Sequence, residues 1–167
     1  MRMTFVLPAL LFAGLVAPAM AAAPAQAEHA RVIEYTSFLE SHPLDARSPA
    51  MRAWLLDWED KSTDVVDMVC DAVLAPLPGK EVDFTGELLA QFVFGSATNQ
   101  LAHPEQKDNL VANQLAGMRS LLKVYAIVLP LKPHARNPRF DELSEKEANG
   151  TLEAYLVPVI NTSCKKA

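Results

Sequence analysis

The sequence predicts an all-α fold, a compact bundle of about six helices around a long central helix at roughly residues 104–129. Apolar side chains recur every three or four residues in most segments, which is the period of an amphipathic helix. Prolines separate these segments at short intervals, and there is no β-hairpin signal. Helices joined by short loops bury their apolar faces against each other, so we expect a bundle.

The central helix is predicted from two neighbouring rows of apolar residues. One row holds Val111, Leu115, Met118, Leu122, Tyr125 and Leu129, and the other holds Leu110, Gly117, Leu121, Val124 and Val128. So wide a face suits a core helix with partners on several sides, whereas a two-stranded coiled coil needs only a narrow seam. Pro104 is expected to begin this helix, and Pro130 is expected to end it.

The N-terminus has the layout of a secretory signal peptide. Met1-Arg2 precedes an apolar run of about 12 residues, too short for a bilayer that needs roughly 20. Small residues with Ala-x-Ala spacing follow at residues 19–21 and 25–27. We predict cleavage after Ala21, with Ala27 as the alternative, and export to the periplasm or the medium as a soluble protein. Residues 22–30 are expected to be a flexible Ala-rich N-terminus, and residues 31–167 a single helical domain.

Two short helices are expected next, at residues 31–41 and from Ser48-Pro49 to about residue 58. The second places Trp54 and Trp58 one turn apart on one face. Large rings at this spacing usually pack in a core, which is the interpretation we favour. The alternative is a shelf that holds an apolar small molecule between these rings and the central helix.

Residues 60–75 are predicted as a third helix, although the segment is rich in valine. Its four aspartates are spaced 4, 3 and 4 residues apart, as on one face of a helix: Asp60, Asp64, Asp67 and Asp71. Such a stripe is typical of a solvated face. The functional alternative is a surface that binds a basic protein partner.

A fourth helix is expected to begin at Asp83 or Thr85 and to carry small residues at Gly95-Ser96-Ala97, where another helix can approach closely. After the central helix, residues 138–149 have only a thin apolar edge. The last helix begins near Leu152, and Pro158 must end it or kink it.

Cys70 and Cys164 are the only cysteines of the chain. In an oxidising compartment a single pair is most simply a disulfide, and the alternative is two buried free thiols. A bond between these two cysteines would close a loop of about 95 residues. The loss of chain entropy in the unfolded state would then stabilise the fold by about 4–5 kcal/mol.

The charge balance excludes some classes of partner. Removal of 21 of the 167 residues leaves 146, enough for one domain with its own core. Arg2 is the only charge in the removed segment, so 15 basic residues become 14, against 20 acidic ones. This acidic balance argues against nucleic acid and against anionic membrane surfaces as partners.

No cofactor or metal site is predicted. The histidines stand alone in the sequence, without a second ligand at zinc-binding spacing: His29, His42, His103 and His134. There is no Cys-x-x-Cys-His motif for covalent haem. An enzyme is the less favoured class. It would be a hydrolase that uses His103 or the acids Asp57, Glu59 and Asp60, and these groups would have to converge in one cleft. We therefore expect a non-catalytic binding module that acts on a protein partner.

Overall fold

The computed structural model describes residues 22–66, 68–77 and 83–164, so the predicted signal peptide lies outside the described residues. Within these ranges the chain is helical and contains no strand, which confirms the predicted all-α class. The elements are α1 (Ala22–Ser41), α2 (Ser48–Lys61), α3 (Asp71–Leu74), α4 (Thr85–Ala102), the short 3-10 helix η1 (Pro104–Gln106), α5 (Leu110–Leu131), the 3-10 helix η2 (Pro133–Ala135), α6 (Pro138–Ala148) and α7 (Leu152–Ser163).

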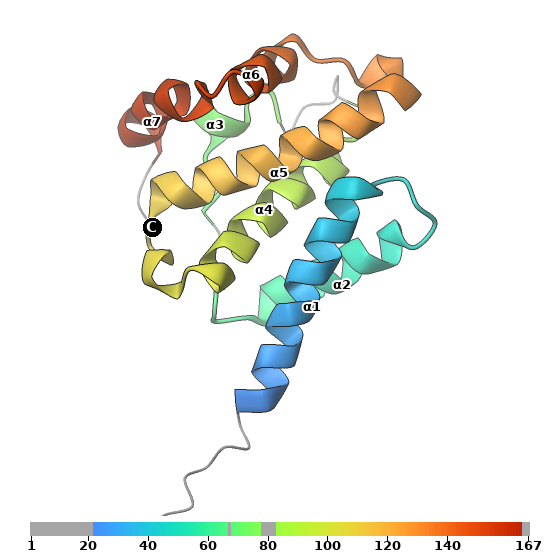
Figure 1. Cartoon of the computed structure of the whole chain (residues 1–167), viewed down its shortest axis with the longest axis vertical. Coiled ribbons are helices and arrows are strands. Elements are labelled where there is room, and N and C mark those ends of the chain that lie inside the picture. Colours follow the sequence, from blue (N-terminus) through green and yellow to red (C-terminus); the bar gives the residue numbers. More distant parts are fainter. Residues whose placement is uncertain (1–21, 67, 78–82, 165–167) are drawn as a thin grey trace, which may run out of the picture.

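Helix α5 is the centre of the fold, as the two apolar rows predicted. It crosses the molecule beside α4 and also contacts α1, α3, α6 and α7 (Figure 1). All members of the two rows are buried except Val111 and Leu129, which are half-buried. A helix with partners on several sides needs such a wide apolar face.

The bounds of the central helix differ from the prediction at both ends. Pro104 begins η1, and α5 starts only at Leu110, because the side chain of Asn109 accepts a hydrogen bond from Ala112 N at 3.1 Å and caps the helix. At the other end Pro130 lies inside the last turn. Ala126, whose carbonyl cannot receive a bond from Pro130, is exposed to solvent, so the helix continues to Leu131 at little cost.

Helix α7 passes Pro158 in the same way. The sequence left open whether this helix ends at Val157 or kinks, and the structure continues it to Ser163. Pro158 and Ala154, the residue four positions earlier, are both exposed. Water can therefore solvate the carbonyl group that proline leaves without a partner.

Two apolar clusters hold the bundle together, and α4 contributes to both. Phe92 of α4 belongs to the larger cluster with Leu121 of α5 and residues of α3, α6 and α7. Phe94, on the other side of α4, packs with Leu39 of α1 and Leu55 of α2. Each of these side chains is at most 1 % exposed, so each contributes about 1.5–3 kcal/mol of burial free energy.

Residues 22–30, for which the sequence predicts a flexible Ala-rich N-terminus, are helical in the structure, because α1 already begins at Ala22. Alanine has the highest helix propensity, so an Ala-rich stretch readily extends a helix that is anchored further along. Here the anchors are His29, whose ring lies edge-on to Trp58, and the fully buried Val32.

The prediction of a helix at residues 60–75 is wrong. Helix α2 ends at Lys61, and a non-helical connection leads to α3, which has only four residues. Side chains of α4 and α5 bind the backbone of this connection. Gln100 Oε1 accepts from Val66 N at 2.7 Å, Gln100 Nε2 donates to Val66 O at 3.0 Å, and Gln114 Nε2 donates to Met68 O. These buried amides satisfy backbone groups that a helix would satisfy internally, and the local valines favour the extended form.

Candidate binding groove beside α5

The two tryptophans pack against α1. The edge of Tyr35 meets the ring of Trp54 at 5.3 Å between centroids, and the Arg31 guanidinium lies over the same ring at 5.3 Å. Trp58 is 9 % exposed and belongs to the smaller apolar cluster with Leu55. The tryptophan face is therefore covered by α1 and does not form a shelf opposite α5.

The predicted acidic stripe is not a surface of one helix. Asp60 lies in the last turn of α2, Asp64 lies in the connection that follows, and Asp71 begins α3. Asp67 lies outside the described residues. Asp64 Oδ2 is 2.8 Å from His29 Nε2, so this carboxylate joins the connection to α1. The spacing of the aspartates fits one face of a helix. It carries no information about the hydrogen bonds from distant residues that hold the connection in a non-helical form.

The groups of the hydrolase alternative have separate partners. Asp57 accepts from Lys61 at 2.5 Å within α2, and His103, at the C-terminal end of α4, faces Glu105 at 3.7 Å. All four side chains are exposed. In the part of the chain that the structure describes, no three His, Cys, Asp or Glu side chains gather closely enough to hold a metal ion.

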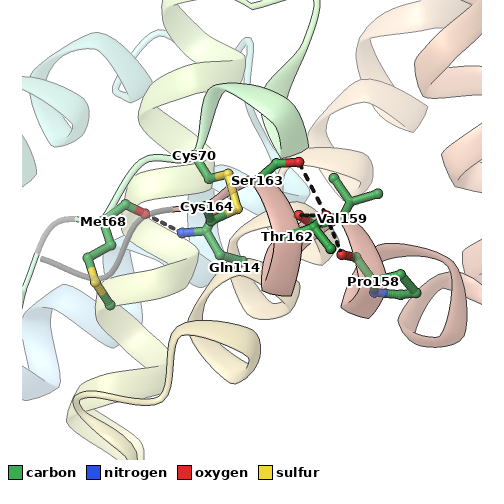
Figure 2. Close-up of a disulfide and its surroundings, with 8 residues drawn as sticks. All are labelled: Met68, Cys70, Gln114, Pro158, Val159, Thr162, Ser163 and Cys164. Carbon is green, nitrogen blue, oxygen red and sulfur yellow. Dashed lines mark hydrogen bonds between the residues drawn. A yellow bond between two sulfur atoms is a disulfide. The ribbon is translucent and has the colours of Figure 1, made fainter.

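Cys70 and Cys164 lie at disulfide distance, 94 residues apart in the sequence (Figure 2). Their Cα atoms are 5.4 Å apart and their sulfur atoms 1.97 Å apart. The pair connects the N-terminal end of α3 to the C-terminal end of α7. Gln114 of α5 lies beside the pair and donates to Met68 O. The segment from Met68 to Cys70 is therefore attached both to α5, through this hydrogen bond, and to α7, through the cysteine pair.

Sequence reasoning missed a groove along the exposed side of α5. Two hollows of about 420 and 350 Å³ adjoin there and share Asn99, Ala116 and Arg119. We call these two hollows together the α5 groove. Its other lining residues come from α1, α4, the η1 region, α5 and α7: Glu40, Gly95, Thr98, Ala102, His103, Gln106, Asn109, Val111, Ala112, Leu115, Ser120, Lys123 and Glu153. A further hollow of about 380 Å³ shares Asn109 and Val111 and leads towards Cys164.

The floor of the α5 groove is a stripe that the apolar rows leave open. Ala112, Ala116, Arg119 and Lys123 follow each other at spacings of 4, 3 and 4 and are half-buried or exposed, while the residues on the other sides of this part of α5 are buried. Two small residues thus make the floor, and two cations lie toward one end. This stripe was visible in the sequence as the complement of the apolar rows, but the walls from α4, α1 and α7 were not.

Polar contacts fix the end of the groove near α1. The two carboxylate oxygens of Glu40 accept from Ser120 Oγ and from Lys123 Nζ, each at 2.7 Å. Ser120 Oγ in turn accepts from Gln91 Nε2 of α4 at 2.8 Å. A chain of hydrogen bonds therefore joins α4, α5 and α1 beneath the groove, and such connected polar groups rigidify the helices that carry them.

A second pair of contacts borders the groove on the side of α6 and α7. Arg119 Nε donates to Glu147 at 3.2 Å, and Arg119 Nη2 lies 3.8 Å from Glu153. On the opposite wall Asn99 Nδ2 donates to Asn113 Oδ1 at 2.9 Å. The walls therefore offer amides and charged groups, while the floor offers little side-chain bulk.

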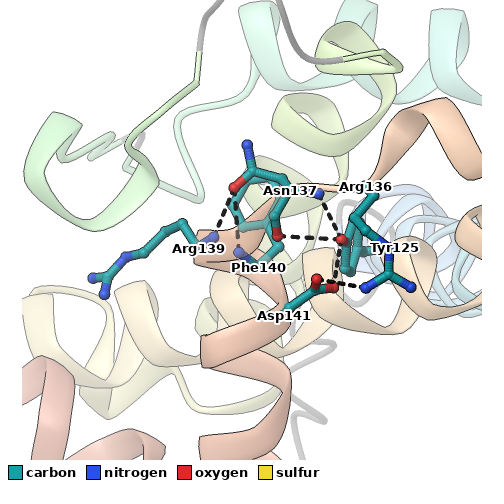
Figure 3. A network of polar contacts seen from close by, with 6 residues as sticks. All are labelled: Tyr125, Arg136, Asn137, Arg139, Phe140 and Asp141. Carbon is teal, nitrogen blue, oxygen red and sulfur yellow. Dashed lines mark hydrogen bonds and ion pairs between the residues drawn. The ribbon is translucent and has the colours of Figure 1, made fainter.

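A separate network around Tyr125 holds the C-terminal half of α5 (Figure 3). The Tyr125 hydroxyl accepts from Asn137 N at 2.8 Å and donates to Asp141 Oδ1 at 2.8 Å, and Arg136 pairs with Asp141 at 2.7 Å. Burial, with the neighbouring Asp141 carboxylate, raises the pKa of Tyr125. This network fixes α6 against α5, and none of its residues lines the α5 groove.

Comparison of the chain with protein-family models, with curated proteins and with solved structures finds no match. Across residues 22–66, 68–77 and 83–164, no helix is both long and apolar enough to cross a bilayer. The α5 groove must therefore be interpreted from its own residues.

Proposed function

We propose that this protein is a non-catalytic binding module that holds a segment of a protein partner in the α5 groove. The observation that carries the proposal is the pair of adjoining hollows on the one side of α5 that its neighbours leave uncovered. Their volumes of about 420 and 350 Å³ lie in the range of about 300–1,000 Å³ that ligand sites occupy.

The lining chemistry supports a peptide as the occupant. Asn99, Gln106 and Asn109 line one hollow, and each side-chain amide can both donate and accept hydrogen bonds. A peptide presents the same two kinds of group at every residue. The floor of Ala112 and Ala116 leaves room for the backbone of a bound segment to approach α5.

Binding is favoured over hydrolysis because the candidate catalytic side chains lie in two different parts of the molecule. His103 lines the groove, whereas Asp57 and Asp60 lie on α2. A hydrolytic mechanism needs an acid or base and a second polar group within hydrogen-bond reach of one substrate. The structure supports a surface for recognition better than it supports such a constellation.

We test the proposal by filling the groove. Ala116→Trp places a large ring on the floor, and Ala126→Trp is the matched control on an exposed position of the same helix. Each protein, tagged and with its cysteine pair intact, is used to capture partners by chemical crosslinking in the native host. We expect a defined crosslinked partner with the parent protein and with Ala126→Trp, and its loss with Ala116→Trp. Equal capture by all three proteins would contradict the proposal.

The proposal includes export before binding. The Ala-rich apolar N-terminus supports cleavage after Ala21, and a cysteine pair at disulfide distance suits an oxidising compartment. Intact mass spectrometry of the protein from its native host, without reduction, tests both points. A chain that begins at Ala22 with a mass two hydrogens below the reduced form is the expected result, and a retained N-terminus would contradict it.

A further inference from the structure

We infer that the bond between Cys70 and Cys164 is a site of thiol–disulfide exchange, which a dithiol partner opens by attack on Cys164 from the hollow beside Asn109. This hollow has a volume of about 380 Å³, and we call it the Cys164 hollow. The inference goes beyond the proposed function, because it requires the bonded cysteine pair but no occupant of the α5 groove.

The two cysteines differ in their access to solvent. Cys164, at the end of α7, is half-buried and lines the Cys164 hollow. Cys70 is only 6 % exposed, belongs to the larger apolar cluster and does not line this hollow (Figure 2). Access helps to decide which sulfur atom of a disulfide is attacked. A thiolate that enters the hollow therefore meets Cys164, while the core covers Cys70.

The exchange proceeds in two balanced steps. The first thiolate of the dithiol forms a bond with Cys164 Sγ, the bond between the two protein sulfur atoms breaks, and Cys70 Sγ leaves with the electron pair and takes up a proton. The second thiol of the partner then loses its proton and displaces Cys164 Sγ. The dithiol is oxidised by two electrons to a disulfide, and the cysteine pair is reduced to two thiols.

The surroundings of Cys70 affect both directions of the first step. An apolar environment disfavours a charged thiolate, and the thiolate is the form that attacks a disulfide. Once displaced, Cys70 therefore returns slowly, and the mixed disulfide at Cys164 persists. The same surroundings slow the departure of Cys70, so we expect exchange with a small thiol on a scale of minutes to hours.

The bond attaches the last turn of α7 to α3, and this turn forms one wall of the hollow. Ile160 is fully buried, but the three residues that follow it, 161–163, are exposed. Opening the bond removes the covalent attachment of the chain beyond Ile160. Because Asn161 and Cys164 line the hollow, its wall can then move, and the hollow adjoins the α5 groove.

The probe for this inference is reduced glutathione, a small peptide thiol. The parent protein with its cysteine pair bonded is incubated with glutathione in native buffer, free thiols are blocked with N-ethylmaleimide, and the modified peptides are identified by mass spectrometry. We expect glutathione on Cys164 and N-ethylmaleimide on Cys70, with a preference of at least about tenfold over the reverse pattern. The preference should disappear in urea, where both sulfur atoms are accessible.

Two variants test whether the attack passes through the hollow. Asn161→Trp places a large ring on its wall, and Thr162→Trp places the same ring on an exposed neighbour that does not line the hollow. Asn161→Trp should slow formation of the mixed disulfide by at least about threefold, because less of Cys164 is accessible. Thr162→Trp should react like the parent, and both variants should keep the helical circular dichroism spectrum of the parent.

Several outcomes would overturn the inference. These are equal modification of the two cysteines in native buffer, a preference for Cys70, and no glutathione adduct in native buffer although the protein in urea reacts. Equal rates for the parent and the two tryptophan variants would also overturn it. The Ala116→Trp crosslinking test uses the protein with its cysteine pair intact, so it decides the proposed function separately.

Discussion

A Cβ atom built on Gly95 would lie only 2.4 Å from Ser120 Cβ, so these two residues set how closely α4 and α5 approach. The same relationship recurs one turn away, where a Cβ on Gly117 would lie 2.6 Å from Phe92 O. Contacts below 3.0 Å do not occur between real Cβ atoms and their neighbours, so no larger residue fits at either glycine without movement of a helix. The small residues at 95–97 had predicted a close helix contact, and this contact forms the base of the groove.

Gly95→Ala should therefore destabilise the fold by about 1–3 kcal/mol, the usual cost of an overpacked core. The matched control is Gly86→Ala, in the first turn of the same helix, where an added Cβ meets nothing within 4 Å. The control should raise stability by up to about 1 kcal/mol, since alanine is the better helix former. Urea unfolding monitored by circular dichroism measures the free energy of unfolding of the two variants. If Gly95→Ala is as stable as the parent, α4 and α5 can move apart to accept a Cβ atom at little cost.

Gln100→Met should release the connection that follows α2. The side chain keeps its size, but Val66 N and Val66 O lose both of their bonds to the Gln100 amide. Buried backbone groups without partners cost about 1–3 kcal/mol. Hydrogen exchange at the Val66 amide should accelerate well beyond the change at core amides of α5. Unchanged protection at Val66 would show that its amide is held by something other than Gln100.

Long-range hydrogen bonds explain why the sequence predicted α5 well and the connection badly. Helix α5 begins at Leu110 and not at Pro104, because the side chain of Asn109 caps it there. Its apolar rows depend only on local spacing, and they face the core as predicted. The Asp spacing from residue 60 to 71 fitted a helix equally well, and only the distant Gln100 and Gln114 decide against it. The groove depends in the same way on walls brought from α1, α4 and α7, so its residues do not form a motif in the chain.

Replacing both Cys70 and Cys164 with serine should lower the free energy of unfolding by about 2–5 kcal/mol, as for other native disulfides. The pair closes a loop of 94 residues, so the unfolded chain gains considerable freedom without it. Melting of the parent with and without reductant should show the same difference as the double variant. Identical melting temperatures under the two conditions would mean that the thiols are not bonded in the folded protein.

Tyr125→Phe tests how α6 is fixed to α5. The variant keeps the ring that meets Phe140 edge-on at 5.4 Å but removes the hydroxyl from Asn137 and Asp141. Loss of these bonds should cost about 1–3 kcal/mol, because Asn137 N and Asp141 are left without this partner. Urea unfolding at neutral pH measures the loss, and an equally stable variant would mean that water replaces the hydroxyl.

The same residue predicts the alkaline limit of the parent protein. The pKa of Tyr125 is raised in the folded state, chiefly by burial, so its neutral form is the one that the fold favours. The contribution to stability is complete below the unfolded pKa of about 10 and is lost as the pH rises through the higher folded value. Unfolding free energies measured from pH 8 to 11 should therefore fall more steeply for the parent than for Tyr125→Phe. Parallel pH curves for the two proteins would show that Tyr125 titrates alike in the folded and unfolded states.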